Sequence, residues 1–82
     1  MKLPRDITGE ELAKSLQRFG YVTTRQTGSH LRLTRVVEEE HNITIPKHKE
    51  IKVGTLNNIL KDVAEHLGKT KAELIFELWG KS

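Results

Sequence analysis

The sequence predicts a small α+β domain in which one helix, three antiparallel strands and two further helices follow one another. Three observations lead to this fold class. Apolar residues recur at helical spacing near both ends of the chain, β-branched and alternating residues fill the middle, and Gly-containing turns separate the segments. Because 82 residues leave room for one domain rather than two, we expect a single domain over 1–82. Its core is expected at about 7–67, with a helical extension at 69–82.

The first helix is predicted from about Gly9 to Phe19. Thr8 and Glu11 have the spacing of a capping box, which marks a helix start. Gly20 is a suitable helix stop. The apolar residues that follow the cap at helical spacing are Leu12, Leu16 and Phe19.

Three segments then favour strands, which are Tyr21–Thr27, His30–Val37 and Asn42–Ile45. Gly28 and Ser29 form the first turn, and the polar residues Glu38–Asn42 are expected to form a hairpin loop. Pro46 should end the third strand. Short links between successive strands imply an antiparallel meander.

The second helix is expected to open at Gly54 and Thr55 and to close at Gly68. Its apolar stripe consists of Leu56, Ile59, Leu60, Val63 and Leu67. Thr70 and Glu73 form a second capping box before a short terminal helix. The first two helices should pack together on one face of the sheet. The predicted order resembles the architecture of double-stranded-RNA-binding domains.

Composition excludes several functional classes. The chain has no cysteine, so it lacks a disulfide framework, a thiolate zinc site and a cysteine nucleophile. Its four histidines do not have metal-ligand spacing such as H-E-x-x-H, so we expect neither a metal nor a small-molecule cofactor. With no signal peptide and no membrane-spanning run, a cytoplasmic location and no membrane partner are expected. The net charge of +3 permits a nucleic-acid partner without requiring one.

The second strand carries the most informative pattern. Because side chains alternate across a strand, Leu31 and Leu33 should face the helices, whereas His30 and Arg32 should face the open side. His30 and Arg32 would then lie about 6.6 Å apart at roughly 3.3 Å per residue. The other histidines are less informative: His41 is expected to be solvated in the acidic loop, and His66 lies near a helix C-terminus.

These exposed groups suit RNA cleavage. An imidazole exchanges a proton near neutral pH, and a guanidinium binds phosphate through forked donors. The small side chains of Gly28 and Ser29 would let a phosphate approach the backbone. We therefore expect His30 to act as general base or acid when the RNA 2′-hydroxyl attacks a phosphodiester, with Arg32 stabilising the charge. Spacing alone leaves open that His30 is an exposed histidine without a role.

A basic segment follows the third strand and leads into the second helix. Its candidate RNA-contacting residues are Lys47, His48, Lys49 and Lys52. The free N–H groups of the following helix start also favour an anion. The segment is equally compatible with a solvated connector.

Ordered motifs within residues 7–67 resemble the HicA family of mRNA interferase toxins. The motifs are FGYV at 19–22, RQTGSH at 25–30, ITIPKH at 43–48, KVGTL at 52–56 and ILK at 59–61. The resemblance implies a double-stranded-RNA-binding-like fold, metal-independent mRNA cleavage and a HicB-type antitoxin that covers the active site. It identifies the functional histidine of the G-S-H step as His30. The role given to Arg32 comes from the strand pattern alone.

The sequence departs from the family in three places. Val53 stands where many members have proline, the acidic residues Glu38–Glu40 replace a short turn, and the tail Lys69–Ser82 extends past the usual end. The leading hypothesis is a toxin endoribonuclease. The alternatives are a non-catalytic RNA-binding module that uses the same basic face, and a protein-interaction domain built around the terminal helix.

Overall fold

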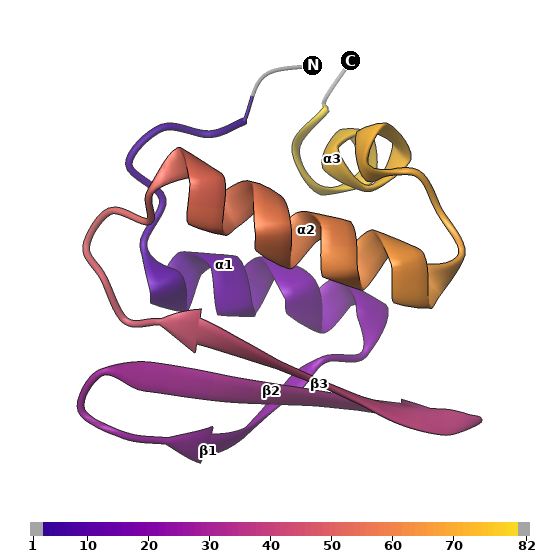
Figure 1. The fold of residues 1–82 in the computed structure, drawn as a ribbon, viewed down its shortest axis with the longest axis horizontal. Coiled ribbons are helices and arrows are strands. Elements are labelled where there is room, and N and C mark those ends of the chain that lie inside the picture. Colours follow the sequence, from indigo (N-terminus) through magenta and orange to yellow (C-terminus); the bar gives the residue numbers. More distant parts are fainter. Residues whose placement is uncertain (1–2, 81–82) are drawn as a thin grey trace.

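A computed structural model describes residues 3–80 and confirms the α+β class and the predicted order of elements. The elements are α1 (Gly9–Leu16), the 3-10 turn η1 (Gln17–Phe19), β1 (Val22–Gln26), β2 (His30–Val37), β3 (Glu39–Pro46), α2 (Val53–Leu67) and α3 (Lys71–Trp79). Figure 1 shows their arrangement. None of these helices is both long enough and apolar enough to cross a membrane. Residues 1–2 and 81–82, at the two ends of the predicted domain, lie outside the described residues.

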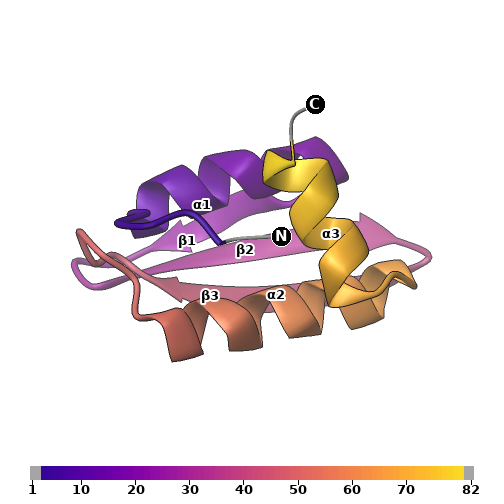
Figure 2. The ribbon, with the colours of Figure 1, turned by 90° about the horizontal axis from the view of Figure 1, so that it is seen from above.

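The molecule is built in layers. The strands form an antiparallel sheet in the order β1-β2-β3. As predicted, α1 and α2 lie side by side over one face of this sheet, and α3 crosses their outer side (Figures 1 and 2). No element among residues 3–80 covers the opposite face of the sheet, so the side chains that point to it are exposed.

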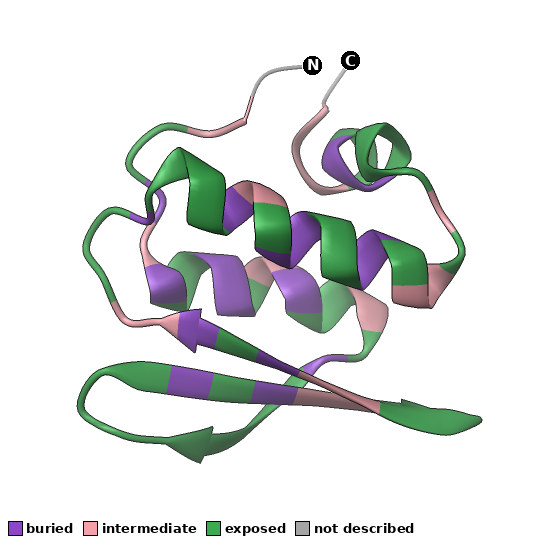
Figure 3. Cartoon of the chain, in the orientation of Figure 1, coloured by how far each residue is buried: buried purple, intermediate pink, exposed green. Residues whose placement is uncertain are grey.

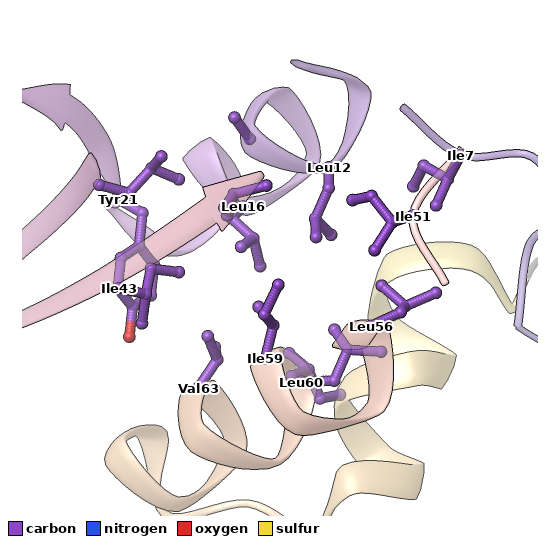
Figure 4. Close-up of a cluster of buried hydrophobic side chains, with 14 of the residues drawn as sticks. Ile7, Leu12, Leu16, Tyr21, Ile43, Ile51, Leu56, Ile59, Leu60 and Val63 are labelled. Atoms are coloured by element: carbon purple, nitrogen blue, oxygen red, sulfur yellow. The ribbon is translucent and has the colours of Figure 1, made fainter. Parts of the chain in front are cut away.

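The hydrophobic core lies between the sheet and the two helices. β2 contributes Leu31 and Leu33, which are 4% and 0% exposed, and β3 contributes the buried Ile43 and Ile45. The helices contribute Leu12, Leu16, Leu56, Leu60 and Val63 to the same cluster, part of which Figure 4 shows. Full burial of one such side chain contributes roughly 1.5–3 kcal/mol. Alternation along β2 therefore fixes which side of the strand is open.

Local capping signals in the sequence are confirmed. The Thr8 hydroxyl accepts a 2.9 Å bond from the Glu11 amide, and the Glu11 carboxylate accepts one from the Thr8 amide. Thr70 and Glu73 repeat this reciprocal pair at α3. Gly20 ends the first helical segment with a left-handed φ of 91°, which a residue with a Cβ adopts at a cost.

The predicted loop over Glu38–Asn42 is wrong. β2 and β3 stay paired as far as Val37 and Glu39, so Glu38, with a φ of 69°, is the single residue between them. The acidic side chains Glu39 and Glu40 are exposed and remain solvated, so their polarity does not oppose strand pairing. The third strand is therefore longer than predicted at its start, and it ends at Pro46, as predicted.

The extension beyond α2 packs against the helical layer. Leu74 and Ile75 are buried in the common core cluster. The Arg18 guanidinium donates to the Glu77 carbonyl, which joins η1 to α3. Trp79 is partly buried against the core, whereas Phe76 is 55% exposed. Phe19, the last apolar residue of the predicted first helix, is half-buried at the edge of the core. The terminal helix thus braces the domain.

Candidate functional site

The open face of β2 carries the candidate catalytic side chain. His30 and Arg32 are exposed, and the leucines between and beyond them are buried, as strand alternation predicted (Figure 3). His30 pairs with Pro46 of β3, which places the imidazole at the end of the sheet where the β1–β2 turn lies. A bound polymer would reach this side chain without displacing any element of the fold.

The β1–β2 turn is held by four short-range hydrogen bonds and one contact to the chain after β3. The Thr27 amide donates to the His30 carbonyl at 2.9 Å, and the His30 amide donates to the Thr27 hydroxyl at 3.0 Å. The Ser29 amide and the Thr27 hydroxyl add weaker bonds. The Lys47 amide donates to the Ser29 carbonyl at 2.9 Å. These bonds fix the backbone that carries the imidazole.

Ser29 contacts the imidazole directly. Its Oγ lies 2.8 Å from Nδ1 of His30. Neighbours within a strand face opposite sides, but Ser29 belongs to the turn, where strand alternation does not apply. Within residues 3–80, Nε2 of His30 has no hydrogen-bond partner. If Nδ1–H donates to Ser29, the Nε2 lone pair is available to take a proton from a ligand.

Gly28 leaves open space at the tip of the turn. A Cβ placed on this residue would meet no atom within 4 Å, and its φ is not in the left-handed region. The backbone therefore does not require glycine here. The missing side chain gives a ligand access to the main chain beside His30.

The basic segment begins beside the turn and then leaves the sheet. Lys47 is half-buried and adjoins Ser29 through its amide. The His48 carbonyl accepts a 3.1 Å hydrogen bond from the amide of Gly9. Any side chain at Gly9 would clash with the Pro46 carbonyl. The chain then rises to the helical layer, where Lys52 is the residue that caps α2 (Figure 1).

The predicted site residues thus fall into two groups. Gly28, Ser29, His30, Arg32 and Lys47 meet at one end of the sheet. His48 and Lys49 are exposed on the connection, and Lys52 is exposed at the start of α2.

Sequence reasoning missed Arg25. If side chains alternated regularly along the strand from the buried Tyr21, Arg25 would lie on the side of β1 that the helices cover. An irregularity between Thr23 and Arg25 shifts the register, so that Arg25 pairs with Arg32 on the open face. A β-bulge of this kind leaves no simple signal in one sequence, although the arginine itself lies in the motif that contains G-S-H.

A second polar cluster occupies the other end of the sheet. The expectation that His41 is merely solvated is wrong: its Nδ1 lies 2.6 Å from the Tyr21 hydroxyl and its Nε2 lies 3.1 Å from the Asp62 carboxylate. The Asp62 carboxylate can only accept, so Nε2 of His41 carries a proton and donates to it. In the neutral imidazole Nδ1 then accepts from the Tyr21 hydroxyl, which stays protonated because burial raises the pKa of Tyr21 to about 12.

Two further side chains complete this cluster. The His66 ring stacks on His41 with centroids 4.2 Å apart, and Nη1 of Arg35 donates to Nε2 of His66 at 3.3 Å. Arg35 pairs with His41 across the sheet, five residues along β2 from His30, which is roughly 16 Å away. The cluster links the sheet to α2 and is separate from the His30 surface.

The His30 surface is open rather than enclosed. A hollow of about 460 Å³ lies between the N-terminal segment and the start of α2, and Lys52 is the one candidate residue in its wall. Within residues 3–80 no three His, Asp or Glu side chains lie close enough to share a metal ion. An open, positively charged surface beside an imidazole suits an extended anionic polymer better than a small molecule.

Comparison with protein-family models identifies a family for this chain. The model described as the HicA toxin of bacterial toxin–antitoxin systems matches residues 9–64, which is more than half of the chain. The matched segment includes His30, Arg32 and the whole basic segment, and α3 lies beyond it. Comparison with curated proteins and with solved structures gives no match.

Proposed function

Since the chain belongs to the HicA family of toxins of bacterial toxin–antitoxin systems, we propose that it is an endoribonuclease that cleaves mRNA with His30 as its catalytic residue. One observation carries this proposal: the imidazole of His30 is exposed on the uncovered sheet face, with Ser29 on one ring nitrogen and no partner within residues 3–80 on the other. A histidine in this state is equipped for proton transfer to a bound ligand.

The proposed reaction uses a nucleophile that RNA itself supplies. The 2′-oxygen forms a bond to the adjacent phosphorus, the bond from phosphorus to the 5′-oxygen breaks, and a 2′,3′-cyclic phosphate and a 5′-hydroxyl result. One proton leaves the 2′-hydroxyl and one is added to the 5′-oxygen. Nε2 of His30 serves at least one of these transfers, which contribute typically 10²–10⁴-fold to a rate. No metal ion or cofactor takes part in this route.

Neighbouring residues hold the substrate in this proposal. Arg32, two residues along the same face of β2, stabilises the charge that builds up on the phosphate oxygens. Ser29 orients the imidazole, and Gly28 lets the RNA backbone approach. The flanking backbone is held by Lys47, His48, Lys49 and Lys52 through sequence-independent phosphate contacts.

Membership of a toxin–antitoxin family implies an antitoxin partner. We propose that a HicB-type antitoxin inhibits the enzyme by covering His30 and the basic segment. Hydrogen exchange of the toxin–antitoxin complex tests this idea: the β1–β2 turn and residues 47–52 should gain protection. If both segments exchange as in the free toxin, inhibition works elsewhere.

A non-catalytic RNA-binding module is the second candidate, because the same exposed cations favour it. Incubation of the purified protein with end-labelled RNA separates the two functions. The proposed enzyme cuts the RNA in the presence of EDTA and leaves 2′,3′-cyclic ends. Salt-dependent binding of intact RNA by the wild-type protein would instead support the binding module.

A further inference from the structure

Arg25 and Arg32 face each other across neighbouring strands on the open side of the sheet. The register shift at Thr24 creates this opposition. The Thr24 hydroxyl lies 2.8 Å from the Thr34 hydroxyl and 3.4 Å from the Arg32 carbonyl, so the bulged residue also lies on the open side. Two residues of β1 thus oppose one of β2, as in a β-bulge.

This juxtaposition is unfavourable in the free protein. Like charges directly opposite each other on one sheet face repel, and here both are always protonated. Within residues 3–80 neither guanidinium has a hydrogen bond or an ion pair to offset the repulsion. On the other side of Arg32, the paired residue is the neutral Thr44. A bound anion would remove the repulsion.

We propose that Arg25 and Arg32 form a clamp for one RNA backbone phosphate, next to the phosphate that reacts at His30. This inference rests on the proposed function. Two forked guanidiniums supply parallel donors to phosphate oxygens, which lysines do not. Arg32 is two residues from His30 on the same face, about 6.6 Å along the strand. The clamp would therefore fix the RNA in register with the imidazole.

Geometry favours RNA over an acidic protein segment as the occupant. The clamp, the imidazole and the open space at Gly28 lie along one exposed surface. A nucleotide chain presents a phosphate to the clamp and a 2′-hydroxyl to the imidazole, whereas an acidic peptide segment has no group for the imidazole to deprotonate. An acidic segment of the antitoxin remains the competing outcome of the test.

The test measures RNA binding with cleavage removed. In the His30→Ala background, the affinity for a single-stranded RNA is measured over a series of salt concentrations with Arg25→Gln and Arg25→Lys. Lys61→Gln is the matched control, because it removes one exposed positive charge from α2, on the covered side of the sheet. Urea unfolding of each variant is measured in parallel.

Arg25→Gln should weaken RNA binding about tenfold and lower the slope of log K against log salt by roughly 0.7–1. Arg25→Lys should restore the slope of log K against log salt, because the positive charge is kept. It should restore only part of the affinity, because lysine lacks the parallel donors of the guanidinium. Arg25→Gln should also be no less stable than its parent.

Antitoxin binding is measured on the same variants, and three results would overturn the clamp: equal RNA binding by Arg25→Gln and Lys61→Gln, loss of stability in Arg25→Gln, or weakened antitoxin binding with RNA binding unchanged. If the wild-type protein binds RNA through Arg25 but does not cut it, the proposed endoribonuclease function is wrong and the clamp is supported. If the wild-type protein cuts RNA and Arg25 does not affect RNA binding, the clamp is wrong and the endoribonuclease function is supported.

Discussion

The hydroxyl of Tyr21 donates a 2.6 Å hydrogen bond to Nδ1 of His41 and thereby joins the start of β1 to β3. His41 is in turn hydrogen-bonded to Asp62 of α2. Tyr21 is fully buried and its ring meets His41 edge-on, with centroids 5.8 Å apart. A neutral tyrosine is therefore built into the packing of sheet against helix, and its ionisation should oppose folding.

The stability of the protein should fall in alkali for this reason. Burial raises the pKa of Tyr21 to about 12 from its ordinary value of 10.0. The unfolded chain loses the Tyr21 proton at a lower pH than the folded chain does. The contribution of the protonated Tyr21 to the free energy of unfolding is therefore complete below about pH 10 and is lost as the pH rises to about 12. Because Tyr21 is the only tyrosine, tyrosinate absorbance follows it alone. Titration of the folded protein at the ordinary value would contradict the buried, hydrogen-bonded hydroxyl.

Tyr21→Phe supplies the matched variant. It keeps the ring but leaves Nδ1 of His41 without its donor, which should cost about 1–2 kcal/mol of unfolding free energy at neutral pH. The steep loss of stability between about pH 10 and 12 should be absent from this variant.

The terminal helix should be necessary for full stability. Leu74 is 0% exposed, so Leu74→Ala should lower the free energy of unfolding by about 2–4 kcal/mol through lost burial and an internal cavity. Phe76→Ala on the same helix removes a larger but 55% exposed side chain and should change stability by less than about 1 kcal/mol. Urea unfolding compares the two. Equal effects would mean that α3 does not pack as described.

Val53 is a position where proline should stabilise the fold. It is the first residue of α2, it is exposed, and the preceding Lys52 has an extended ψ of 144°, which a following proline requires. Val53→Pro should raise the unfolding free energy by about 0.4–1 kcal/mol by restricting the unfolded chain. Thermal unfolding checks this, and RNA cleavage should be unaffected. A destabilised variant would show that the helix does not begin at Val53.

Gly28 should be needed for RNA and not for folding. Space around it is open and its φ is ordinary, so Gly28→Ala should leave the unfolding free energy within about 0.5 kcal/mol of wild type. RNA cleavage should fall, and fall further in Gly28→Val, because the added groups occupy the path of the backbone. Unchanged cleavage in both folded variants would mean that RNA does not approach there.

Local signals in the sequence were sufficient for much of the fold. The capping boxes at Thr8 and Thr70 depend on residues three apart, and the burial of Leu31 and Leu33 depends on alternation within one strand. Exposure of His30 follows from the same alternation. These features need no knowledge of distant parts of the chain.

Other features depend on tertiary structure. The bulge that turns Arg25 toward Arg32 is fixed by how β1 pairs with β2. The contact of Ser29 with His30 depends on the conformation of the turn. The β2–β3 hairpin is longer than predicted, because acidic residues, which are typical of loops, stay solvated at exposed positions of these strands. His41 has one partner, Tyr21, just before β1 and another, Asp62, in α2.

The most direct measurement is RNA cleavage by a fold-checked His30→Ala variant. Because the His30 side chain is exposed and, in the part of the chain that the structure describes, is hydrogen-bonded to Ser29 alone, the substitution should change the unfolding free energy by less than about 0.5 kcal/mol. Cleavage of labelled RNA should fall by at least about 10²-fold. The wild-type products should carry 2′,3′-cyclic phosphates, with or without EDTA. A folded His30→Ala protein that cuts RNA at the wild-type rate would contradict the assignment of His30 as the catalytic residue.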